Sequence, residues 1–220
     1  MVTIRMLPAL VAACVIAGAE QAAAQQSINL AQALDQGKLK SASRGVSKLP
    51  ERNGVRVEAK PGDGAVVWLV GSEFKAGTIE VDVRGKDLMQ QSFVGLAFHG
   101  KDDKTYEAVY LRPFNFRAED PVRRDHAVQY ISMPEHGWAR LRKEFPEEFE
   151  NPVDKSLGPE DWVRLRITVD GSRVQIYAGQ VTTPTLEVRK LGQLDGGMVG
   201  LWLGNNSEGD FANLTITPAK

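Results

Sequence analysis

Length, composition and charge restrict the functions open to this chain. With 220 residues it is long enough for one domain with a substantial core. Its 27 Lys and Arg residues nearly balance its 28 Asp and Glu residues. No field of one sign therefore attracts nucleic acid or an anionic membrane surface, and we expect neither as a partner.

Residues 1–24 are predicted to be a signal peptide. Arg5 gives a positive start, and the apolar run from Met6 to Ala19 is too short to span a membrane. Ala22-Ala23-Ala24 fits a cleavage site of small residues, which makes Gln25 the mature start. We therefore expect a periplasmic or secreted protein without a membrane span.

Cys14, the only cysteine, lies within this signal segment. Together with the preceding Val11-Ala12-Ala13 it also resembles a lipoprotein cleavage box, which would tether the protein through a lipid on Cys14. With Gln25 as the first residue, the mature chain has no cysteine. Disulfides, a thiol nucleophile and thiolate metal sites are then excluded.

Residues 25–53 are predicted to form an N-terminal helix and a linker. Ser27 to Gln36 has the pattern of one short amphipathic helix that ends at Gly37, and the polar residues after it predict an irregular connection.

Residues 54–220 show the pattern of a single lectin-like β-domain. Gly77 to Arg84 and Trp162 to Val169 alternate between apolar and polar residues, as half-buried strands do. Turn signals such as Asp170-Gly171 separate such runs. About a dozen short strands without long helices predict an all-β fold, a two-sheet antiparallel β-sandwich of the jelly-roll type.

Residues 134–151 interrupt the strand pattern. Leu141, Phe145 and Phe149 are spaced four apart, on one face of a helix, although Pro146 must bend or end it. We expect a helical insertion that lies across one end of the sandwich.

Two adjacent runs, Ser92 to His99 and Thr105 to Arg112, predict strands with unlike faces. One face is apolar, and the other carries small, aromatic and hydrogen-bonding residues. Aromatic rings beside fixed polar groups are suited to sugars, so this second face predicts a carbohydrate-binding groove. The candidate binding residues on it and on the following bend are His99, Tyr106, Tyr110, Arg112, Asn115, Asp125, Gln129 and Trp202.

Tyr106, Tyr110 and Trp202 are the expected stacking platforms, and the polar residues of the set are expected to bond sugar hydroxyls. The alternative is that residues 134–151 cover this face, so that its rings pack against the insertion and leave no open groove.

Two residues are candidates for acid–base catalysis. Glu107 shares a face with apolar neighbours, so it is either a catalytic acid or one half of a buried ion pair with Arg112 or Arg124. His126 is either a general base or a satisfied histidine at a strand edge. No carboxylate pair has the spacing of a glycosidase motif within one strand.

No cofactor motif is found. The oxygen-rich loop at residues 204–211 has two interpretations, a Ca²⁺ site without EF-hand spacing or a turn built by Asn and Gly.

On these residues, the chain resembles the concanavalin A-like lectin/glucanase jelly roll of the laminin-G-like type, near the 3-keto-disaccharide hydrolase (DUF1080) group. The resemblance rests on Gly77 to Arg84, Ser92 to His99, Val199 to Gly204 and Gly209 to Leu214. It implies a carbohydrate ligand.

In the hydrolase group, a strand of the form Tyr-Glu-x-Gln presents its Glu and Gln to the groove. The matching stretch here is His126-Ala127-Val128-Gln129, which keeps the Gln but has Ala127 where that group has Glu. Three functional hypotheses follow: an exported carbohydrate-binding domain, a glycoside-active hydrolase on the same groove, and an envelope module that binds another protein.

Overall fold

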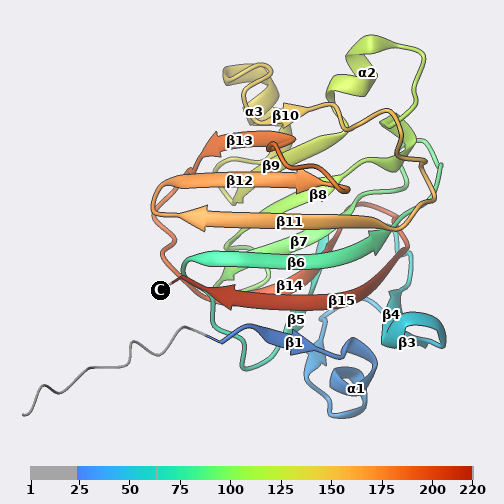
Figure 1. Ribbon diagram of the computed structural model, residues 1–220, viewed down its shortest axis with the longest axis vertical. Helices are drawn as coiled ribbons and strands as arrows, with labels where there is room; N and C mark the ends of the chain where they lie inside the picture. The colour runs from blue at the N-terminus through green and yellow to red at the C-terminus, as the bar shows by residue number, and fades with distance from the viewer. Residues whose placement is uncertain (1–23, 63, 220) are drawn as a thin grey trace, which may run out of the picture.

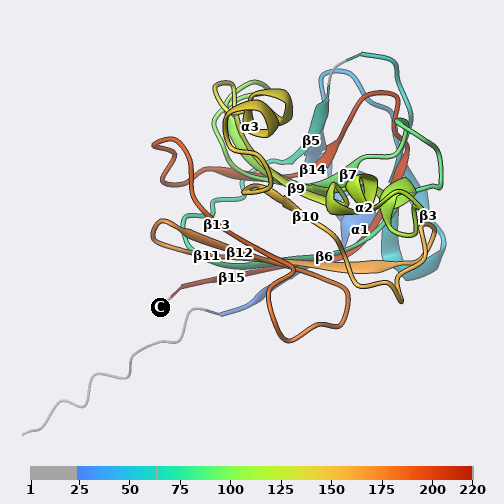
Figure 2. The ribbon, with the colours of Figure 1, turned by 90° about the horizontal axis from the view of Figure 1, so that it is seen from above.

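The computed structural model describes residues 24–62 and 64–219. Cys14 and almost all of the predicted signal peptide lie outside these residues. Two antiparallel β-sheets pack face to face, as Figure 1 shows from the front and Figure 2 from above. The predicted two-sheet sandwich is thus confirmed.

Sheet A forms one layer, and its ten-residue strand β15 lies near the middle. One edge of β15 pairs with β6, and its other edge pairs first with β4 and then with β1. In sheet order the strands are β13 (Leu186–Arg189), β12 (Arg173–Ala178), β11 (Val163–Asp170), β6 (Gly77–Arg84), β15 (Gly209–Pro218), β4 (Gly54–Val57) and β3 (Val46–Leu49), with β1 (Gln26–Ile28) beside β4.

Sheet B forms the other layer and carries most of the predicted site residues. Its strands, in sheet order, are β10 (Glu150–Asn151), β9 (Val128–Met133), β8 (Tyr106–Leu111), β7 (Val94–Gly100), β14 (Met198–Leu203), β5 (Ala65–Leu69) and β2 (Leu39–Lys40).

The core lies between the two sheets because each strand directs alternate residues inward. Ile79 and Val81 of β6 face Leu96 and Phe98 of β7 across it, and all four side chains are fully buried. Burying each such side chain stabilises the fold by about 1.5–3 kcal/mol.

The N-terminal region is more regular than predicted. The helix α1 (Leu30–Asp35) is shorter than expected, because Gln26–Ile28 pairs with β15 instead of joining the helix. The helix begins after Asn29, whose side chain caps it by accepting from Gln32 N at 2.9 Å. The expected linker contains β2, β3 and the 3₁₀ turn η1 (Glu51–Asn53).

Three short helical elements lie near the β9 and β10 end of sheet B. They are η2 (Pro113–Asn115), α2 (Pro121–Asp125) and α3 (Trp138–Glu144). Figure 2 shows α3 on the side of sheet B that faces away from sheet A, and it packs against β9. The predicted insertion therefore gives one two-turn helix and the two-residue strand β10.

Candidate functional site

The outer face of sheet B has a floor of aromatic rings above small residues. The register aligns Gly95 with Tyr110 on one side and with Trp202 on the other. The Tyr110 and Trp202 rings stack across Gly95, with centroids 4.3 Å apart and an interplanar angle of 21°. The Trp202 Nε1–H donates to the Tyr106 hydroxyl at 3.2 Å, which adds a third ring to the floor.

These rings are almost completely buried. The exposed fraction is 4% for Tyr106, 2% for Tyr110 and 6% for Trp202. The backbone at Gly64 lies against the Trp202 ring, since a Cβ there would be 3.0 Å from it. A stacking platform needs an accessible ring face, so these three residues support the site from below. The cover over Trp202 is the Gly64 backbone, whereas the alternative named residues 134–151 as the cover.

Arg112 connects three of the predicted binding residues. Its Nη2 donates to the Tyr110 hydroxyl at 2.9 Å and to Gln129 Oε1 at 3.0 Å, and its Nη1 donates to the His126 carbonyl at 2.8 Å. The guanidinium carbon is 4.9 Å from the Tyr110 ring centroid, within cation–π distance. The structure therefore brings Tyr110, Arg112 and Gln129 together, as the sequence predicted.

Glu150 is the carboxylate that sequence reasoning missed. It pairs with Gln129 in the β10–β9 register, and it accepts from Arg142 Nε at 2.9 Å and from Arg142 Nη2 at 2.8 Å. Its Oε2 is 3.5 Å from Arg112 Nη1, and its Oε1 is 2.9 Å from His126 Nδ1. The neighbouring strand thus supplies a carboxylate beside Gln129, although Ala127 supplies none.

The residues Glu150, Arg112, Arg142, His126 and Gln129 form what we call the Glu150 cluster. Solvent reaches it through two members, because the side chains of Arg142 and His126 are 36% and 20% exposed, while those of Arg112 and Glu150 are 6% and 4% exposed. Burial lowers the pKa of His126 despite the nearby Glu150 charge, and the hydrogen bond to Glu150 raises the pKa of Arg142.

Trp138 provides an exposed ring next to this cluster. It begins α3, its exposed fraction is 52%, and the Arg142 guanidinium carbon lies 5.2 Å from its ring centroid. The sequence pattern placed Trp138 in the covering insertion rather than in the site. A tryptophan at a helix start was the only available signal, and it is equally typical of a packing residue.

His99 lies in the core instead of on the outer face, whereas Glu107 is on the apolar face predicted for it, with His99 and Tyr130 as partners in place of Arg112 or Arg124. The side chains of His99 and Glu107 are both fully buried, and His99 has a backbone φ of +53°, which breaks the alternation that predicted its outward position. Glu107 accepts from the Tyr130 hydroxyl at 2.5 Å and is 2.9 Å from His99 Nδ1. Because Glu107 has no accessible surface, we assign it a structural role in place of the catalytic one considered above.

Asp125 and Asn115 occupy short helical elements. Asp125 is the last residue of α2 and is exposed. The helix forms there because Pro121 begins it and because the Asp120 side chain caps it by accepting from Val122 N at 2.9 Å. Asn115 is buried in η2 and weakly donates to the His126 carbonyl at 3.4 Å. Asp125 is thus outside the strand predicted for it, and Asn115 supports His126 from below.

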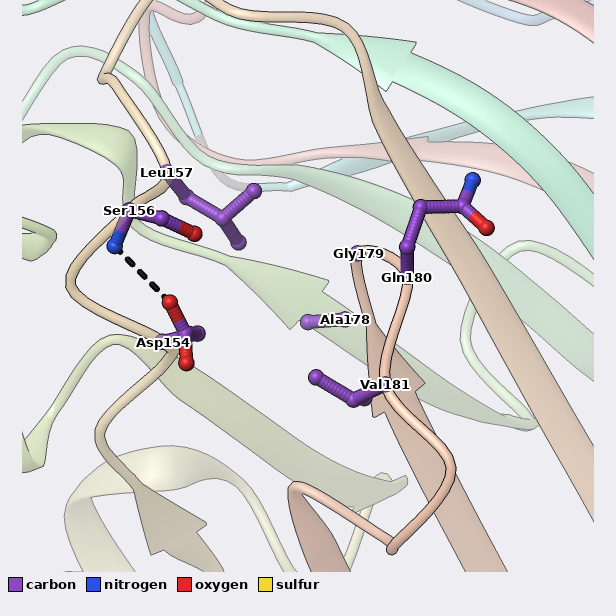
Figure 3. Close-up of a pocket in the computed structure, with 7 residues that line it drawn as sticks. All are labelled: Asp154, Ser156, Leu157, Ala178, Gly179, Gln180 and Val181. Carbon is purple, nitrogen blue, oxygen red and sulfur yellow. Dashed lines mark hydrogen bonds between the residues drawn. The ribbon is translucent and has the colours of Figure 1, made fainter.

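Two hollows lie away from the Glu150 cluster. One is a cavity of about 160 Å³. It lies between Asp154, Ser156 and Leu157 on one side and residues 178–181 on the other (Figure 3). A cleft of about 410 Å³ runs between β1, α1 and the turn at residues 69–72. Neither is lined by a predicted site residue.

Two carbonyl oxygens of the loop at residues 204–211 already accept hydrogen bonds from an arginine side chain. Arg44 donates to Gly204 O at 2.9 Å and to Ser207 O at 3.2 Å. In the described part of the chain, no group of three His, Cys, Asp or Glu residues could hold a metal ion, and no helix is long and apolar enough to cross a membrane.

Comparison of the whole fold with solved structures gives clear similarities at low sequence identity. The carbohydrate-binding module CBM66 from Bacillus subtilis aligns with a TM-score of 0.58 and 14% identity over 81% of this chain and 94% of that module. The VIP36 exoplasmic/lumenal domain in its Ca²⁺/Man₃GlcNAc-bound form gives 0.56 and 10% over 84% of each chain.

A transglycosylase gives a similar result. Crh5 in complex with NAG aligns with a TM-score of 0.57 and 13% identity over 90% of this chain and 86% of that one. No family model and no curated protein matches the sequence. Together with the sheet order, these similarities show that the chain has the concanavalin A-like lectin/glucanase jelly-roll fold.

Proposed function

We propose that this protein is an exported carbohydrate-binding domain and that the glycan binds at the Glu150 cluster beside Trp138. The observation that carries the proposal is the exposed Trp138 ring, which adjoins hydrogen-bonding groups held in fixed positions. The predicted signal peptide supports export.

The chemistry of the cluster is suited to a sugar. An exposed indole offers an apolar face for the C–H face of a pyranose. Arg142 lies over one face of this ring and leaves the other face for a sugar. Its guanidinium is fixed by two hydrogen bonds to Glu150, so little side-chain entropy remains to be lost on binding. His126 adds a partly exposed imidazole that can bond a hydroxyl.

The similar structures support the same class of ligand. One is a carbohydrate-binding module and another is a lumenal domain bound to an oligosaccharide. Since a shared fold alone does not transfer a function, the proposal depends on the cluster and not on the fold.

A glycoside-active hydrolase is the second candidate, and one observation favours it. Glu150 and His126 lie 2.9 Å apart beside Gln129, so a carboxylate and an imidazole adjoin the proposed sugar site. In that case Glu150→Gln abolishes turnover of a bound glycan. Binding without any turnover by the wild-type protein removes this candidate.

The test is a glycan array with the mature protein from Gln25, with and without calcium, followed by titration calorimetry on each hit. We expect Trp138→Ala to weaken binding about tenfold or more, which corresponds to about 1.4 kcal/mol. Trp162→Ala is the matched control, because Trp162 is partly exposed at the start of β11 in the other sheet and contacts Arg52 and Arg84. Wild-type affinity in Trp138→Ala contradicts this site.

A clean negative array with folded protein contradicts carbohydrate binding itself. It favours the third hypothesis, an envelope module that binds another protein.

A further inference from the structure

We infer that the glycan bound at the Glu150 cluster is anionic and carries a carboxylate or sulfate group. This inference rests on the proposed function, and it names the class of sugar that the cluster selects.

The charges within the cluster do not balance. Among the described residues, Glu150 is the only carboxylate within 4 Å of Arg112 or Arg142. Two guanidiniums therefore share one carboxylate, and His126, which is either neutral or positively charged, supplies no negative charge to balance them. Arg112 is nearly buried, and its hydrogen-bond acceptors are a carbonyl, a hydroxyl and an amide oxygen.

An excess positive charge at a buried position is costly unless an anion compensates it. A cluster that keeps two arginines for one glutamate is consequently better suited to a negatively charged ligand than to a neutral one.

The adjacent helix α2, which packs beside β10, adds two further arginines without carboxylate partners. Arg123 donates to Phe114 O at 2.9 Å and to Asn115 Oδ1 at 3.3 Å. Arg124 donates to Ala118 O at 2.7 Å and to Glu119 O at 2.8 Å. These acceptors hold the side chains in place but leave their charges uncompensated.

Acidic side chains also occur in this segment. These acidic residues are Glu119, Asp120 and Asp125. All three are exposed, and none forms an ion pair with the Arg123 or Arg124 guanidinium within 4 Å. Exposed carboxylates are screened by solvent and salt, so they offset the part-buried arginines only weakly.

Arg142 is the group that an incoming anion meets first. Its Nε and Nη2 are bound to Glu150, whereas its Nη1 has no acceptor within the described ranges. The guanidinium carbon lies over the exposed Trp138 ring, 5.2 Å from its centroid, so Arg142 occupies one face of that ring. A pyranose stacks on the other face, and its anionic substituent reaches Nη1 at the edge of the ring. Carboxylate and sulfate oxygens accept charge-assisted hydrogen bonds from guanidinium donors.

The test compares matched sugars by titration calorimetry at two salt concentrations. The probes are trigalacturonate, its neutral methyl ester and a sulfated disaccharide. We expect at least one acidic probe to bind about tenfold or more tightly than the neutral ester, with an affinity that falls between about 50 and 300 mM NaCl. The probe that binds distinguishes a carboxylate from a sulfate ligand.

Two variants locate the effect. Arg142→Gln removes the acidic preference, and Arg123→Gln weakens it. Arg140→Gln on the same helix is the matched control, because Arg140 pairs with Glu144 at 2.9 Å and is not part of the cluster. Circular dichroism confirms that each variant is folded.

The outcomes separate the inference from the proposed function. If neutral glycans bind as tightly as acidic ones and still need Trp138, the inference is wrong and carbohydrate binding stands. If none of the three probes and no glycan on the array binds to folded protein, both are wrong. An acidic preference that Arg142→Gln leaves intact also overturns the inference.

Discussion

His99 Nδ1 lies 2.9 Å from Glu107 Oε1, and both side chains are fully buried. The imidazole Nε2 donates to the Lys75 carbonyl at 2.9 Å, and the Tyr130 hydroxyl donates to Glu107 while accepting from Leu191 N at 3.1 Å. This chain of bonds attaches two loops, those before β6 and before β14, to the centre of sheet B.

The first prediction concerns this buried pair. Glu107→Ala removes the partner of His99 Nδ1 and the acceptor of the Tyr130 hydroxyl, and it leaves polar groups unpaired in the core. We expect it to lower the free energy of unfolding by about 3–5 kcal/mol. Urea denaturation followed by fluorescence measures the change.

Glu187→Ala is the control for that measurement. Glu187 pairs with Arg173 at the surface, where 44% and 56% of the two side chains are exposed, so the loss of stability should be much smaller than in Glu107→Ala. Equal effects of the two substitutions contradict the structural role of Glu107.

The fold was largely predictable because strand alternation is a local signal. Gly77–Arg84 was predicted residue for residue, since its inward side chains fill the core and its outward ones are polar. By contrast, β1 pairs with a strand almost two hundred residues away, so nothing in residues 26–28 themselves could indicate it.

The site was predictable only in part. Arg112, Tyr110 and Gln129 were placed together because they lie on adjacent strands with the same outward phase. Glu150 was missed because β10 has two residues and shows no periodicity. The burial of Trp202 was missed because the loop over it comes from elsewhere in the chain.

The second prediction separates the floor from the exposed platform. Trp202→Ala removes a buried ring that stacks on Tyr110, and it should cost about 3–5 kcal/mol of stability. Trp138→Ala should change stability by about 0.5 kcal/mol or less, because that ring is half exposed. Thermal unfolding of both variants tests the distinction, and a large loss in Trp138→Ala contradicts its role as an exposed platform.

A third prediction follows from the close approach of backbones at Gly95. A Cβ at this position would lie 2.0 Å from the Val109 carbonyl oxygen, which no side-chain movement relieves. Gly95→Ala should destabilise the protein by about 1–3 kcal/mol or more. In Gly137→Ala the nearest atom is Met133 Sδ at 3.6 Å, so this control should lose about 1 kcal/mol or less.

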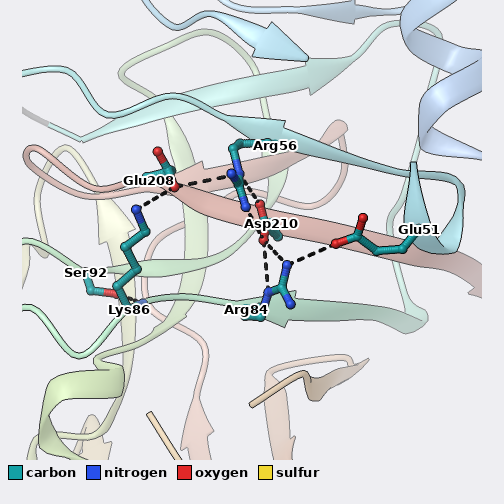
Figure 4. A network of polar contacts seen from close by, with 7 residues as sticks. All are labelled: Glu51, Arg56, Arg84, Lys86, Ser92, Glu208 and Asp210. Carbon is teal, nitrogen blue, oxygen red and sulfur yellow. Dashed lines mark hydrogen bonds and ion pairs between the residues drawn. The ribbon is translucent and has the colours of Figure 1, made fainter. Parts of the chain in front are cut away.

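The fourth prediction is that the stability of the protein depends on pH through an ion-pair network on sheet A. Figure 4 shows Asp210 between Arg56 and Arg84, with carboxylate–guanidinium distances of 2.7 and 2.6 Å. Burial alone would raise the pKa of Asp210, but the hydrogen bonds from the two arginines outweigh it and lower the pKa.

The sign of the effect follows from this lowered pKa. The stability that Asp210 contributes is fully present above its unfolded pKa of about 3.9 and is lost as the pH falls through the lower folded value. Asp210→Asn should therefore flatten the fall in unfolding free energy in acid. Asp35→Asn, which removes an exposed ion pair with Lys48, should keep the wild-type slope. If Asp210→Asn leaves the slope of unfolding free energy against pH unchanged, Asp210 is not the source of the acid dependence.

The position of β15 has a consequence for how the chain folds. The last strand of the sequence lies inside sheet A, between β6 and the pair β4 and β1, so that sheet cannot close before the C-terminal residues have been synthesised. Contacts between the two ends of the chain also slow folding, because a long loop must close first. Sheet A is therefore completed only after residues 209–218 have been made, and a chain cut before them should lack a stable sheet A.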